Sequence, residues 1–130
     1  MREIKFRGRD RELFLWRYGD LDTKSSPDLV SIIDDCDYAV DPDTVGQYTG
    51  LKDAKGKEIY EGDILLYRLP ENMIALNNSD KSVVFYDHGM FLVSHGKIGF
   101  SVEHVLGVHG DGAVVIGNVH DNPELLEVEA

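Results

Sequence analysis

The apolar residues of this chain come in short runs separated by Gly and Asp, and this spacing is what most constrains the fold. LVSII, VVFY, MFLV and AVVIGNV are typical runs, and none continues into the apolar repeat of an amphipathic helix. Short apolar runs between turn-forming residues are typical of β-strands. With 42% hydrophobic residues in 130, the chain also has enough apolar side chains for a core. The sequence therefore predicts a mainly β fold, a small antiparallel barrel or sandwich built from hairpins.

The length predicts a single domain over residues 1–130, with an N-terminal hairpin region and a central and C-terminal β region that meet at about residue 44 or 45. The hairpin is predicted from two apolar stretches, Ile4 to Phe6 and Leu13-Phe14-Leu15-Trp16, with one buried face. Residues 19–28 are predicted to form a loop, and DDCDYAVDPDT an irregular acidic connection. At the other end, Asn122 in an N-cap position and Pro123 after it predict a short C-terminal helix.

The segment QYTGLKDAKGKEIYEGDILLY has the clearest turn chemistry. Asp53 and Gly56 fit the first and fourth residues of a type I turn, with Gly56 at positive φ in a three-residue hairpin loop. Glu61 and Asp63 flank Gly62 and could act as paired carboxylates, with Tyr48 and Tyr60 near them. We favour the simpler interpretation, in which Asp63 accepts a backbone hydrogen bond at a bend where Gly62 supplies the unusual φ.

Charge is distributed unevenly along the chain, whose net charge is -11. Residues 1–17 carry a net charge of +3, whereas residues 20–43 carry eight aspartates against one lysine. Either the basic hairpin docks on the acidic segment, within one chain or between subunits, or the hairpin, with Arg7, Arg9 and Arg11, forms a patch for an outside polyanion. We favour docking. The overall acidity argues against nucleic acid and membrane surfaces as partners.

The residues with metal or nucleophile chemistry lack the spacing of a known site. The five histidines have aspartates near them but no recognised ligand pattern, so we expect no metal and no cofactor; the residues are His88, His95, His104, His109 and His120, with Asp87, Asp111 and Asp121. The acids of DDCDYAVDPD do not fit an EF-hand, and we interpret Asp35, Asp37, Asp41 and Asp43 as a solvated loop. Cys36 is the only cysteine and has no adjacent histidine. We expect no enzyme activity.

The central segment QYTGLKDAKGKEIYEGDIL, together with MREIKFR at the start and VIGNVHDNPELLE at the end, resembles the YopX family of bacteriophage and prophage proteins. The resemblance spans the chain. Where the family usually has a small residue, Trp and Asp after the opening strand, this chain has Gly8, Arg9 and Asp10, and we expect Trp16 to fill a related space. Twelve residues form the signature of the central segment: Gln47, Tyr48, Thr49, Gly50, Leu51, Asp53, Gly56, Ile59, Tyr60, Glu61, Gly62 and Asp63.

The resemblance implies a β-rich, phage-encoded protein that forms oligomers, and it offers no catalytic residues. The N-terminal segment MREIKFRGRDRE lacks the apolar core of a signal peptide, so we expect the protein in the cytoplasm of the bacterial host. We expect a non-enzymatic accessory protein that binds itself or a phage or host protein. Two alternatives remain open: a metal-dependent hydrolase or nuclease that uses the C-terminal His and Asp residues, and nucleic-acid binding through the basic hairpin.

Overall fold

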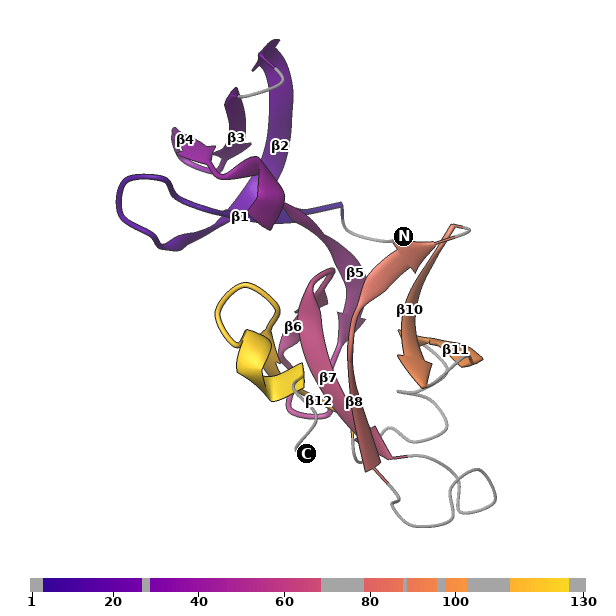
Figure 1. Ribbon diagram of the computed structural model, residues 1–130. Helices are drawn as coiled ribbons and strands as arrows, with labels where there is room; N and C mark the ends of the chain where they lie inside the picture. The colour runs from indigo at the N-terminus through magenta and orange to yellow at the C-terminus, as the bar shows by residue number, and fades with distance from the viewer. Residues whose placement is uncertain are drawn as a thin grey trace. The chain divides into compact units, whose positions relative to one another are not determined.

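The computed structural model describes residues 4–26, 29–68, 79–87, 89–95, 98–102 and 113–126. The chain forms two compact units, Met1–Gly50 and Leu51–Ala130. Among the described residues are twelve strands, and every strand pairing with a resolved register is antiparallel. The predicted mainly β, antiparallel fold is confirmed (Figure 1).

The first unit is built on one curled sheet with the strand order β4-β3-β2-β1-β5. Strand β5 carries the chain into the second unit, and β6 follows β5 in the same order. The elements described in the first unit are β1 (Phe6–Arg9), β2 (Trp16–Ser26), β3 (Leu29–Ile33), β4 (Asp37–Val40), the 3-10 turn η1 (Pro42–Thr44) and β5 (Gly46–Lys52).

Of the two predicted arrangements, a barrel or a sandwich, the barrel is wrong, because the sheets of the described residues do not close. The end of β1 meets β4 at one isolated bridge, Asp10 to Val40, and two further backbone bonds extend this contact. Arg11 N–H donates to the Ala39 carbonyl at 3.2 Å, and Asp41 N–H donates to the Arg9 carbonyl at 3.0 Å. Such a short contact bends the sheet without joining its edges along the length of the strands.

A small apolar core lies on one face of this sheet. Alternation along the strands places Val30, Ile32 and Val40 on that face, and all three are buried. Leu21, which pairs with Ile32, packs against them. Gly8 is required here, because a Cβ at this position would lie 2.8 Å from Val40 Cγ2.

Two predictions for this region are wrong. The loop predicted over residues 19–28 is wrong where it is described, because residues 19–26 continue β2. Asp37–Val40 of the acidic connection forms β4. Pro27 and Asp28 lie outside the described residues. The polar residues pair because β2, β3 and β4 are hydrogen-bonded side by side, with Leu21 opposite Ile32 and Ile32 opposite Tyr38. Pairing of strands overrides the low strand propensity of Asp, Ser and Gly.

In the described part of the second unit, strands form two three-stranded sheets, β12-β7-β8 and β11-β10-β9. Its core consists of Ile59, Leu65, Val84, Phe91, Val93, Val102 and Ala113. Its elements are β6 (Glu58–Tyr60), β7 (Asp63–Arg68), β8 (Ser79–Val83), β9 (Phe85–Asp87), β10 (Met90–His95), β11 (Ile98–Ser101), β12 (Val114–Asn118) and the 3-10 turn η4 (Pro123–Leu126).

Two of the short apolar runs, MFLV and AVVIGNV, are confirmed as strands: MFLV lies in β10, which pairs with β9, and AVVIGNV contains β12. The predicted C-terminal helix is wrong, since the described residues end in the single 3-10 turn η4. Pro123 does take the first position of this turn. The side chain of Asn122, however, accepts the Asn118 N–H at 3.3 Å, so it ties the turn back to β12. No helix in the described part of the chain has the length and apolar character needed to cross a membrane.

Candidate functional site

Three consecutive large apolar side chains are exposed in the first unit. Leu13, Phe14 and Leu15 are 62%, 69% and 53% exposed. They were predicted to begin the second strand of a hairpin with one buried face, and this prediction is wrong because β2 begins only at Trp16. We call residues 11–15 the Asp10 loop, after the residue that holds it.

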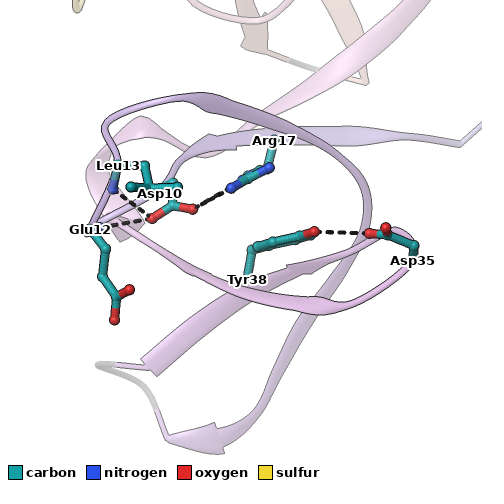
Figure 2. A network of polar contacts seen from close by, with 6 residues as sticks. All are labelled: Asp10, Glu12, Leu13, Arg17, Asp35 and Tyr38. Carbon is teal, nitrogen blue, oxygen red and sulfur yellow. Dashed lines mark hydrogen bonds and ion pairs between the residues drawn. The ribbon is translucent and has the colours of Figure 1, made fainter.

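The carboxylate of Asp10 fixes the shape of this loop (Figure 2). Its Oδ1 accepts the backbone N–H groups of Glu12, at 2.8 Å, and Leu13, at 3.2 Å. Its Oδ2 accepts two hydrogen bonds from Arg17, from Nε at 3.0 Å and Nη2 at 2.9 Å. The hydrogen bond from Glu12 N–H is the largest of the effects that hold the pKa of Asp10 below its usual value, and the bonds from Leu13 and Arg17 add to it.

Backbone hydrogen bonds close the same loop. Asp10 N–H donates to the Leu15 carbonyl at 2.8 Å, and Phe14 N–H donates to the Asp10 carbonyl at 3.0 Å. Phe14 has φ 59°, in the left-handed region that a bulky side chain rarely adopts. Such a conformation costs about 1–3 kcal/mol and persists where the surrounding contacts impose it. The Asp10 loop therefore presents its apolar side chains in one imposed conformation.

Arg17 extends this polar network to the acidic strand. Its guanidinium carbon lies 3.8 Å from the ring centroid of Tyr38, and the Tyr38 hydroxyl donates to Asp35 Oδ1 at 2.9 Å. Figure 2 shows Arg17 next to Asp10 and the Tyr38 ring, with the Tyr38 hydroxyl directed at Asp35. The hydrogen bond to Asp35 is the main reason why the pKa of Tyr38 is raised above its usual value.

A hollow of about 330 Å³ lies beside the Asp10 loop. It is lined by two arginines, two aspartates and one aromatic ring: Arg9, Arg11, Asp10, Asp41 and Phe14. The backbone bonds between the ends of β1 and β4 hold this region together. Thr44 adds to them, because its hydroxyl accepts the Arg9 N–H at 2.9 Å and donates to the Asp41 carbonyl at 2.6 Å.

The three arginines predicted as an interaction patch differ in their surroundings. The guanidinium carbons of Arg7 and Arg9 lie 4.7 and 5.0 Å from the Trp16 ring centroid, and Arg7 is only 5% exposed. Arg11 is exposed, beside the hollow. The basic strand β1 and the acidic strands β3 and β4 lie in one sheet, and docking of the basic hairpin on the acidic segment stays a prediction.

The signature residues of the central segment take structural positions. Asp53 accepts the N–H groups of Lys55, Lys57 and Val115 at 2.8 to 2.9 Å. Burial acts to raise the pKa of Asp53, but these three hydrogen bonds outweigh it and hold that pKa below its usual value. Gly56 has φ 85°, and its N–H donates to the Asp53 carbonyl at 3.0 Å, which confirms the predicted turn.

Asp63 is 1% exposed and accepts the Tyr60 N–H at 2.8 Å, while Gly62 has φ 93°. The interpretation in which Asp63 accepts a backbone hydrogen bond at a bend formed by Gly62 is therefore confirmed. Of the other signature residues, Tyr48, Thr49, Ile59 and Tyr60 are buried, whereas Gln47, Gly50, Leu51 and Glu61 are half-buried.

Within the described residues, no group of three or more His, Cys, Asp or Glu side chains is placed to hold a metal ion. His88, His104, His109 and Asp111 lie outside those residues, and His95 is described only in its backbone, so their convergence stays untested. His120, Asp87 and Asp121 are exposed. Asp35, Asp37, Asp41 and Asp43 are exposed as predicted, and Asp41 caps η1 by accepting the Asp43 N–H at 3.1 Å. The Cys36 thiol is also exposed.

Asp10, Phe14, Arg17 and Tyr38 have roles in this site that the sequence did not predict. One signal was available: LFLW is an unbroken apolar run, and a strand with a single buried face alternates instead.

Comparisons with known proteins relate the chain to one family model and to solved structures. The family model described as YopX protein matches residues 5–127. Among solved structures, the crystal structure of protein EF1440 from Enterococcus faecalis is similar, with a TM-score of 0.62 and 28% sequence identity over 98% of this chain and 100% of that chain. No curated protein matches the sequence.

Proposed function

The chain belongs to the YopX family, and from this premise we propose that it acts as a non-enzymatic protein-binding module whose recognition surface is the Asp10 loop. The observation that carries the proposal is the exposure of Leu13, Phe14 and Leu15 on a loop of imposed conformation. Aromatic and aliphatic side chains that enter a partner's pocket supply most of the binding energy in many interfaces.

The hydrogen bonds of the loop make it suited to binding. Asp10 accepts from the backbone of Glu12 and Leu13, and the Asp10 and Phe14 amides donate to backbone carbonyls of the same loop. Because these bonds already order the loop, a partner does not have to supply that ordering free energy. Exposure of three neighbouring apolar side chains costs hydrophobic free energy in the isolated unit, and a partner surface would recover it.

The buried carboxylates support a non-enzymatic role. Asp10, Asp53 and Asp63 each accept backbone N–H groups, so their positions are explained by the fold without a reaction. The guanidinium groups of Arg7 and Arg9 both lie against Trp16, and this contact within the chain argues against nucleic acid as the partner. The hydrolase alternative depends on histidines outside the described residues. Phage or prophage origin and oligomer formation stay predictions from the resemblance. Cytoplasmic location stays a prediction from the N-terminal sequence, which lacks the apolar core of a signal peptide.

A capture experiment tests this function. The wild-type chain and the variant Leu13→Ser/Leu15→Ser are immobilised and exposed to extract from host cells that carry the phage or prophage. Met90→Ser is the matched control, because Met90 is 50% exposed on a strand of the second unit. We expect a specific protein to bind the wild type and Met90→Ser and to be lost with the loop variant. Equal capture by all three chains, or none by the wild type, would show that the Asp10 loop is not a recognition surface.

A further inference from the structure

We infer that the occupant of this surface is a second copy of the chain, placed across a two-fold axis with the Phe14 ring of each copy in the hollow of the other and Arg11 of each copy facing Asp41 of the other. This inference rests on the proposed function and names the partner. The carrying observation is that one patch holds the exposed ring, the hollow and both signs of charge.

A two-fold interface requires a patch that is complementary to itself. Phe14 is 69% exposed and borders the hollow, so the inserting group and the receiving space belong to the same surface. The hollow, of about 330 Å³, is large enough for a phenyl ring, because an engineered cavity of roughly 150 Å³ admits benzene. Two copies related by a two-fold axis can therefore exchange rings, each into the other's hollow.

The charges of the hollow favour a second copy over a strongly basic partner. The chain has a net charge of -11, and this overall acidity would attract a basic protein. The hollow itself has balanced charge, since Arg9 and Arg11 accompany Asp10 and Asp41. A basic partner would meet the two arginines, whereas a second copy pairs Arg11 with Asp41 twice across the axis. Arg11 and Asp41 are both exposed, so both can make this contact.

The loop does not need to reorganise to bind. The bonds from Asp10 to Glu12, Leu13 and Arg17 are already made in the single chain. A patch made of one loop and one hollow falls in the small class of interfaces, and we expect a dissociation constant on the order of micromolar. The association is therefore to be sought across a range of protein concentrations and at moderate salt, which screens the repulsion between two acidic chains.

Sedimentation equilibrium with charge-exchanged variants tests the inference. Arg11→Asp and Asp41→Arg each place like charges across the axis, and we expect each to weaken the dimer at least about tenfold. An equimolar mixture of the two variants restores both opposite-charge pairs, and so does the double variant Arg11→Asp/Asp41→Arg. Both are expected to dimerise about as well as the wild type. Lys55→Asp, at an exposed position of the second unit, changes the net charge by the same amount as Arg11→Asp and is the control for net charge.

Phe14→Gly provides a second variant that does not depend on charge or on the cap at Asp41. Glycine adopts φ 59° without strain, so this variant keeps the backbone and removes only the ring. We expect it to be folded and to lose dimerisation at least about tenfold. A wild-type chain that is monomeric at every concentration, or a mixture of single variants that does not re-form dimers, would overturn the inference. If capture in extract still depends on Leu13 and Leu15 in that case, the proposed function survives with a different partner.

Discussion

Arg17 donates two hydrogen bonds to one carboxylate oxygen of Asp10, at 3.0 and 2.9 Å, while the other oxygen of Asp10 accepts the amides of Glu12 and Leu13. One side chain thus ties a surface loop to strand β2. Without this tie, an apolar sequence such as Leu13-Phe14-Leu15 would be free to turn toward a core. The network explains how apolar side chains stay exposed on an ordered loop.

Removing the Asp10 carboxylate is expected to loosen the Asp10 loop. In Asp10→Ala the amides of Glu12 and Leu13 lose their acceptor, and Arg17 loses its ion-pair partner. We expect amide hydrogen exchange of Glu12 and Leu13 to accelerate at least about tenfold, with β7 unaffected. Asp10→Asn keeps one carbonyl acceptor and is the matched control, with a smaller effect. Unchanged exchange in Asp10→Ala would show that the carboxylate does not hold the loop.

Acid is expected to loosen the same loop. The pKa of Asp10 is lowered in the folded chain, mainly by the hydrogen bond from Glu12 N–H. Because the folded pKa is lowered, the ionised Asp10 carboxylate stabilises the folded chain fully above the pKa of an unfolded aspartate, about 3.9. This stabilisation is lost as pH falls through the lower folded pKa. Exchange of the Glu12 and Leu13 amides, corrected for intrinsic rates, should therefore rise only below about pH 4. In Asp10→Asn this pH dependence should disappear; its persistence would assign the effect to another acid.

Replacing Asp53 should lower the free energy of unfolding more than any other single substitution in its hairpin loop. Its carboxylate accepts the Val115 N–H, 62 residues away, at 2.9 Å, as well as two amides of its own loop. Asp53→Ala leaves these donors without their acceptor, and we expect a loss of about 2–3 kcal/mol in the free energy of unfolding, measured by denaturant titration. The neighbouring exposed Lys55→Ala should change stability by less than about 0.5 kcal/mol. Equal losses in the two variants would contradict the role of the carboxylate.

Phe14→Gly should raise stability although it removes a large apolar side chain. The ring is 69% exposed, so little buried contact is lost, and glycine relieves the strain of φ 59°. We expect a gain of about 1 kcal/mol, seen as a higher thermal midpoint in dilute solution. Leu13→Gly, in the same loop but without a positive φ, should give no gain. A loss of stability in Phe14→Gly would mean that the ring is packed against the protein.

The turns of this fold could be predicted because their chemistry is local. Asp53 with Gly56 and Gly62 with Asp63 each act within a few residues, and both were located from spacing alone. Strand β2 could not be predicted beyond Tyr18, because the polar residues that follow pair through the neighbouring β3. Gly19 itself is fixed by that neighbour, since a Cβ there would lie 2.2 Å from the Ile33 carbonyl oxygen.

The conformation of the Asp10 loop could not be predicted either, because it too depends on contacts beyond the local sequence. An apolar run predicts burial by default, and only the hydrogen bonds of Asp10 reverse that outcome for Phe14. Because Arg17 is supplied by the following strand and Val40 by a strand 30 residues from Asp10, the geometry depends on pairings that spacing alone does not reveal.

Photo-crosslinking from position 14 tests the central claim most directly, namely that the Asp10 loop contacts another protein chain. A benzophenone side chain is introduced at Phe14 and, as control, at Met90, and cells or purified samples are irradiated. We predict a specific covalent product from position 14, identified by mass spectrometry as a second copy of this chain joined at the hollow beside Asp41, with no equivalent product from position 90. No product from position 14, or the same products from both positions, would contradict the claim.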